Sequence, residues 1–226
     1  RTLSLWIFFV PLIAINFCRF ISLNYHLFEN TIFTVDQIGR SQFTIPYIDG
    51  GLSISRASRT YPAYLIFKPG MIITGILLIY YWKKNNQLIN KFKKIDYKNH
   101  AFKTFGVLSA VFLIIHSILL GIEVDIKVFK FLRRVVFLCF IIFEIVAQGL
   151  LVYNFYKLRS NIKDLFNLSF LKLKIVLVSI LSLVAMLSIP MLTTSGNVHF
   201  KHGLEWNYFI GVILFYLLTR LFWKKF

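Results

Sequence analysis

Six long apolar runs, separated by short polar segments, divide this chain of 226 residues. A helix needs about 20 residues to cross the roughly 30 Å of hydrocarbon in a bilayer. The runs lack the strict apolar–polar alternation of a membrane β-barrel strand. The sequence therefore predicts an all-α fold, a single domain 1–226 that forms an integral membrane bundle of six transmembrane helices. The expected spans are residues 3–21, 61–82, 104–121, 135–153, 175–191 and 206–223.

The basic residues lie in clusters between the apolar runs and predict the orientation of the bundle. The formal charge is +17 although 58% of the residues are hydrophobic, a combination typical of a membrane protein rather than of a nucleic-acid-binding domain. Because cytoplasmic loops are enriched in Lys and Arg, the richer side is predicted to be cytoplasmic, with both termini on it. Sixteen of the 26 basic residues belong to that side: Arg1, Lys83, Lys84, Lys91, Lys93, Lys94, Lys98, Lys103, Lys157, Arg159, Lys163, Lys172, Lys174, Arg220, Lys224 and Lys225.

The longest loop, residues 22–60, is then extracytoplasmic. It contains two β-prone pieces, "TIFTV" (31–35) and "QFTIPYI" (42–48), which predict a small β hairpin. Directly after this loop, Pro69, Gly70 and Gly75 are expected to interrupt the second span.

Ionisable residues inside a membrane are costly, so each one is a candidate functional residue. Lys68, His116 and Glu144 fall in the outer half of their spans, and Gln148 follows Glu144 on the same helix face. They predict a polar pocket that opens toward the extracytoplasmic leaflet. The alternative is a structural arrangement in which Lys68 pairs with Glu144 and His116 is a core histidine.

A second set of polar residues precedes the last span. His199, His202 and Glu205 are spaced by three, which puts them on one face of a helix. This spacing leaves three alternatives open: zinc ligands, contacts to a lipid headgroup or substrate, and capping at the membrane interface. Zinc is the least favoured because the spacing is not the H-E-x-x-H pattern, and no cofactor is expected.

Two short motifs resemble those of a known family. "SISRASRTYPAYLIFKPG" (53–70) is similar to the segment that leads into span two in the FRAG/DRAM/SFK group of six-span membrane proteins, and "HGLEWNYFIGVILFYLLT" (202–219) is similar to the opening of their last span. The resemblance implies cytoplasmic termini, a large first outer loop and a role in lipid handling, such as GPI-anchor lipid remodelling. The chain departs from the family pattern where Pro62-Ala63-Tyr64 lacks an arginine before the tyrosine.

Together these features predict a protein that binds or helps to process or remodel lipid of the GPI-anchor or phospholipid type at its extracytoplasmic face, and they favour a non-enzymatic role over an enzymatic one without deciding between them. In this hypothesis Arg56 and Arg59 hold the headgroup phosphate. Lys68, His116, Glu144 and Gln148 orient the rest of the polar region, and Glu205 closes the pocket.

Two other functions remain open: a membrane hydrolase or acyltransferase that uses His199, His202 and Glu205, and a scaffold subunit of a membrane complex. In every case the expected partners are membrane lipid, including anionic lipid at the cytoplasmic loops, and protein partners in the case of a scaffold, but not nucleic acid. The expected location is a multi-pass protein of the Golgi, ER, lysosome or plasma membrane, or of a bacterial inner membrane.

Overall fold

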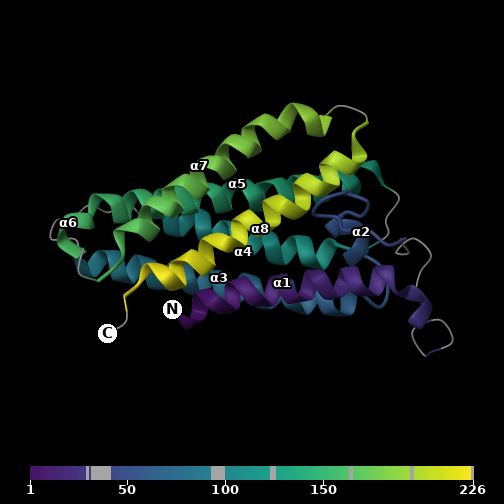
Figure 1. Ribbon diagram of the computed structural model, residues 1–226, viewed down its shortest axis with the longest axis horizontal. Coiled ribbons are helices and arrows are strands. Elements are labelled where there is room, and N and C mark those ends of the chain that lie inside the picture. Colours follow the sequence, from purple (N-terminus) through teal and green to yellow (C-terminus); the bar gives the residue numbers. More distant parts are fainter. Residues whose placement is uncertain are drawn as a thin grey trace.

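A computed structural model describes residues 1–28, 31, 42–92, 100–122, 126–162, 165–193 and 196–224 (Figure 1). Six of its helices are long and apolar enough to cross a membrane. These are α1 (Thr2–Leu23), α3 (Tyr64–Phe92), α4 (Ala101–Leu119), α5 (Lys127–Lys157), α7 (Leu168–Thr193) and α8 (Val198–Phe222). Three short helices, η1 (Tyr25–Leu27), α2 (Ile54–Ser58) and α6 (Arg159–Ile162), lie between them, and the described residues include no strand.

The six predicted spans are confirmed as helices, but most of the helices extend beyond the predicted bounds. Helix α3 continues to Phe92, ten residues past the predicted end at Trp82, and α5 begins at Lys127, eight residues before Val135. The extensions are rich in Lys, Arg and Asn, which suit the headgroup layer rather than the hydrocarbon. Hydropathy therefore identifies an apolar stretch of each helix but not the ends of the helix.

The expected interruption of the second span is wrong, since α3 runs without a break through Pro69, Gly70 and Gly75. Pro69 lies only five residues after the helix begins, so its missing N–H costs one hydrogen bond near the first turn. Gly70 instead serves packing. A Cβ atom there would lie 2.7 Å from the Cβ of Ala14, so glycine lets α1 and α3 approach closely, as small residues do in membrane bundles.

The long helices form a closed ring in the order α1, α3, α4, α5, α7, α8, with α8 returning to pack on α1. Successive long helices run in opposite directions, so both termini lie at one end of the bundle (Figure 1). A hydrogen bond of 3.2 Å from the Arg1 guanidinium to the carbonyl of Lys224 joins them. We call this end the terminus end and the opposite end, which carries α2, the cap end.

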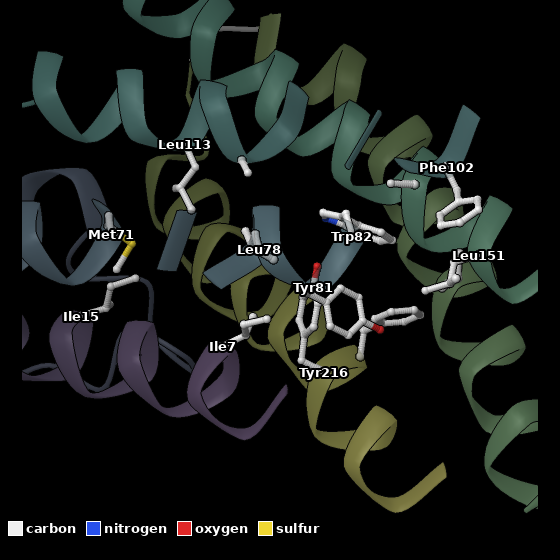
Figure 2. Packing of buried hydrophobic residues seen from close by; sticks show 14 of the residues in the cluster. Ile7, Ile15, Met71, Leu78, Tyr81, Trp82, Phe102, Leu113, Leu151 and Tyr216 are labelled. Atoms are coloured by element: carbon white, nitrogen blue, oxygen red, sulfur yellow. The ribbon is translucent and has the colours of Figure 1, made fainter. Parts of the chain in front are cut away.

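Buried apolar side chains from all six long helices form one cluster inside the ring, and Figure 2 shows part of it. Trp82 of α3 is fully buried and lies flat against Gly106 of α4, where a Cβ atom would approach the indole to 2.2 Å. Tyr81 of α3 and Tyr216 of α8 meet edge to face across the ring, with 5.0 Å between ring centroids. Contacts of α8 with α7 on one side and α1 on the other thus close the bundle.

The predicted hairpin is only partly within the described residues. "TIFTV" falls almost entirely outside them, while "QFTIPYI" folds into turns, not a strand. Residues 42–63, including α2, fold back over the ends of α1 and α8, and we call this segment the cap.

Candidate functional site

Asp49 organises the turn at the start of the cap. Its carboxylate accepts hydrogen bonds from the Thr44 hydroxyl and from the backbone N–H groups of Ile45 and Gly51, at 2.8 Å for each N–H. These donors, the Thr44 hydroxyl foremost, hold the pKa of Asp49 below its usual value because they stabilise the charged form. The turn therefore carries an ionised carboxylate at neutral pH.

The start of α8 holds the cap in place through contacts from four side chains. The ring of His202 lies 3.0 Å from the carbonyl of Gly50, Trp206 donates to the carbonyl of Leu52 at 2.7 Å, and Asn207 donates to that of Tyr47 at 2.7 Å. The remaining contact is made by Glu205, whose carboxylate accepts from the backbone N–H groups of Ile54 and Ser55 at the beginning of α2. The motif "HGLEWN" (202–207) is therefore a docking motif for the cap.

Helix α1 supports the cap from the other side. Arg19 donates to the carbonyl of Thr44 at 2.8 Å, and the hydroxyl of Tyr47 donates to Asn16 at 3.0 Å. Burial raises the pKa of Tyr47, so its phenol stays protonated and available as a donor. Deeper in the bundle, the thiol of Cys18 contacts the carbonyl of Ala63 at 3.3 Å.

An open cleft of about 430 Å³ lies where the cap turn meets the first turns of α8. His199 is exposed on this cleft and uses neither ring nitrogen in a hydrogen bond with a described residue. The rim is apolar, since Ile48 is 84% exposed and Phe200 is 53% exposed. The lining of this cap cleft consists of Tyr47, Ile48, Asp49, His199, Phe200, Gly203, Leu204 and Asn207.

A polar cluster is buried in the middle of the bundle, around Glu144 of α5. One carboxyl oxygen, Oε1, accepts from Gln148 at 3.0 Å and from the hydroxyl of Tyr216, while Oε2 lies 2.5 Å from the hydroxyl of Ser109. Ser109 also lies 2.9 Å from the carbonyl oxygen of Gly106, and its single proton cannot serve both contacts. A carboxylic acid that donates from Oε2 to Ser109 satisfies every contact.

Lys174 of α7 is a second buried ionisable residue, and the sequence reasoning assigned it to a cytoplasmic loop. Its ammonium donates to the hydroxyl of Thr219 at 2.8 Å and lies 3.9 Å from the ring centroid of Phe215. Tyr81 contacts the same hydroxyl at 3.1 Å. The spacing of buried residues on α7 could have revealed it, because Leu171, Lys174, Val178 and Leu181 form one helical stripe.

The pocket predicted from Lys68, His116 and Glu144 is not assembled. Lys68 lies over the ring of Tyr64, 5.2 Å from its centroid, and His116 stacks on Phe137 with 5.0 Å between centroids. The predicted ion pair between Lys68 and Glu144 is likewise wrong, since Glu144 takes its partners from α4, α5 and α8. What holds is the shared face of Glu144 and Gln148, confirmed by their hydrogen bond.

Of the two candidate arginines, Arg56 lies in the cap helix α2 and Arg59 directly follows it. The backbone N–H of Arg56 donates to the capping hydroxyl of Ser53 at 3.0 Å, and its side chain is exposed. Arg59 is half-buried, and its guanidinium lies 3.4 Å from the carbonyl of Ser55. Neither lines the cap cleft.

The set His199, His202 and Glu205 does not form a zinc site. Two of its members are engaged with the cap backbone, and no group of three or more His, Cys, Asp or Glu side chains suited to a metal occurs within the described residues. His202 and Glu205 bind the cap backbone, and of the three residues only His199 lines the cleft. The alternatives of headgroup contacts and of capping at the membrane interface stay predictions.

Six helices of membrane-spanning length in one closed ring define the architecture of a multi-pass membrane protein. Comparison with protein-family models, with curated proteins and with solved structures finds no match. The resemblance to the FRAG/DRAM/SFK group therefore stays a prediction.

Proposed function

We propose that this protein binds a membrane lipid at the cap end, with the headgroup in the cap cleft and the acyl chains along the outside of the bundle. The observation that carries the proposal is the amphipathic lining of the cleft. Asp49, His199 and Asn207 provide hydrogen-bonding groups, while the exposed Ile48 and Phe200 provide an apolar rim. Sugar hydroxyl groups of a lipid headgroup match the first set, which includes the ionised Asp49, and the start of an acyl chain matches the second.

The depth of the cleft agrees with this assignment. Helix α8 has 25 residues and is about 37 Å long at a rise of about 1.5 Å per residue, more than the roughly 30 Å of hydrocarbon. Its first turns, which form one wall of the cleft, would then lie in the headgroup layer. Arg56 on the neighbouring α2 is close enough to repel a positive charge on His202. The guanidinium of Arg56 therefore lies near the cleft, although Arg56 does not line it.

An enzymatic role for His199, His202 and Glu205 has less support. A hydrolase or acyltransferase needs its base and nucleophile directed toward a substrate. Here the side chains of His202 and Glu205 are bound to the backbone of the cap. We therefore favour lipid binding without chemistry on the lipid by these residues.

The proposal is tested by the lipid that copurifies with the protein from its membrane in mild detergent. Replacing Ile48→Asp puts a charge on the apolar rim and should lower the bound lipid per protein about tenfold, because losing the burial of one aliphatic side chain costs about 1.5 kcal/mol or more. His199→Ala should have a smaller effect on the same measurement by mass spectrometry.

The matched control is Phe43→Asp, because Phe43 is also 84% exposed on the cap but does not line the cleft. It should keep the lipid content of the unaltered protein. Equal loss from Phe43→Asp and Ile48→Asp would show that any charge on the cap disturbs lipid, and unchanged content in Ile48→Asp would rule the cleft out.

A further inference from the structure

We infer that the first two turns of α5, residues 127–134, bind anionic phospholipid headgroups in the leaflet that surrounds the cap end. We call these residues the α5 interface segment. The inference does not depend on the proposed lipid cleft, because the segment lies outside the cleft lining.

The length of α5 places the segment beyond the hydrocarbon. Its 31 residues correspond to about 46 Å, whereas the apolar stretch from Val135 to Tyr153 covers about 28 Å and is sufficient to span the bilayer core. The eight residues before Val135 therefore extend about 12 Å into the headgroup layer.

One face of the segment is apolar and is not covered by the protein. Val128, Phe131 and Leu132 lie within about 100° of one another around the helix and are 71%, 67% and 49% exposed. Apolar side chains of this size, left exposed at the membrane surface, are expected to insert into the boundary between headgroups and acyl chains.

The other face is cationic. Lys127, Arg133 and Arg134 lie within about 120° of one another, in an arc that does not overlap the apolar one, and each lies at least about 100° from Val128. None of the three side chains makes a hydrogen bond or an ion pair with a described residue. Arg133 is also close enough to His116 to be repelled when His116 is positively charged. The acidic residues Glu123 and Asp125, which precede the segment in the sequence, lie outside the described residues.

The position of these cations within the helix strengthens the case for an anionic partner. The beginning of an α-helix carries a partial positive charge, so Lys and Arg are unfavourable there unless an anion compensates them. No acidic residue occurs between residues 126 and 134. A basic amphipathic segment with its apolar face toward lipid is the pattern that binds anionic membrane surfaces, and each Lys or Arg near the surface adds to the attraction.

The test measures which lipid surrounds the segment. A fluorophore is attached at Phe131→Cys in a protein that also carries Cys139→Ser, leaving only the fully buried Cys18. The protein is reconstituted into vesicles that contain brominated phosphatidylserine or brominated phosphatidylcholine at the same mole fraction. We expect quenching to report an enrichment of phosphatidylserine over phosphatidylcholine of at least about fivefold, the effect of one basic residue near the surface.

Two charge-matched variants decide where the preference arises. The phosphatidylserine preference should disappear, with a ratio of about one between the two lipids, in the variant Lys127→Gln/Arg133→Gln/Arg134→Gln. Added salt should have the same effect on the parent protein, because salt screens the attraction. Lys83→Gln/Lys84→Gln/Lys91→Gln removes the same charge from the terminus end and should leave the enrichment unchanged.

Equal quenching by the two lipids in the parent protein would overturn the inference, and so would an equal loss in both triple variants. Ile48→Asp, introduced together with the label, should retain the enrichment. The α5 interface segment and the cap cleft are thereby tested separately, and failure of one leaves the other standing.

Discussion

Glu144 is held by hydrogen-bond partners from three helices, and this determines which substitutions it tolerates. Glu144→Gln keeps an acceptor for Tyr216 and Gln148 and offers an amide N–H to Ser109, so it should unfold within about 0.5 kcal/mol of the parent protein. Glu144→Leu removes the carboxyl oxygen that accepts from the Tyr216 hydroxyl and should cost about 1–3 kcal/mol. Unfolding in a graded series of detergent mixtures measures both.

A double-mutant cycle tests whether the stability lost in Glu144→Leu comes from the unpartnered Tyr216 hydroxyl or from other effects of replacing Glu144. Tyr216→Phe added to Glu144→Leu should recover most of the lost stability, because the buried hydroxyl that lacked a partner is removed. If Glu144→Gln were as destabilising as Glu144→Leu, the charge of the carboxylate, and not its hydrogen bonds, would be what the bundle requires.

At the scale of elements, the contact between the cap and α8 depends on one glycine. Gly50 has φ +61°, and a Cβ atom there would lie 1.7 Å from the carbonyl oxygen of His199. Gly50→Ala should therefore cost about 1–2 kcal/mol for the left-handed backbone and a further 1–3 kcal/mol for the clash. Limited proteolysis of the cap in detergent, followed by mass spectrometry, should show faster cleavage within residues 42–63.

Gly196 provides the matched control. Its φ is +99°, so an added Cβ strains the backbone, but apart from its chain neighbours no described residue has an atom within 4 Å of the Cβ position. Gly196→Ala should leave the rate of cap cleavage unchanged. Equal protection of the cap in both alanine variants would mean that α8 does not hold it.

The elements also show what the sequence alone determines. Apolar runs identified all six membrane-length helices because a bilayer penalises every unpaired backbone group, which leaves helices as the solution. Helix ends were not determined, since Lys and Asn continue a helix into the headgroup layer as readily as they end it. Lys174 was wrongly assigned to a loop because it is charged, although it lies on the buried stripe of α7.

The candidate site was less predictable than the fold. The spacing of Glu144 and Gln148 is local information and correctly indicated a shared face. The partners of Glu144 on α4 and α8, and the docking of residues 202–207 on the cap, are contacts between distant parts of the chain. One sequence contains no pairing information for these contacts, so Lys68 and His116 were grouped with Glu144 on depth alone.

For the whole molecule, the orientation in the membrane is the remaining prediction. The ring places the termini at the end that carries sixteen basic and two acidic residues by sequence, whereas the cap end has most of the acidic ones. The terminus end is therefore expected to be cytoplasmic, by the positive-inside rule. Lys174 weakens this asymmetry by only one charge, since it is buried in the bundle and not exposed in a loop.

Single cysteines at the two ends test this orientation. In a Cys139→Ser protein expressed in a bacterial inner membrane, Phe43→Cys should react with a membrane-impermeant maleimide in intact spheroplasts, because Phe43 is 84% exposed at the cap end. Lys84→Cys, at an exposed position toward the terminus end, should react only after the membrane is opened. The reverse labelling would place the cap in the cytoplasm, and the α5 interface segment would then face the leaflet richest in anionic lipid in eukaryotic membranes.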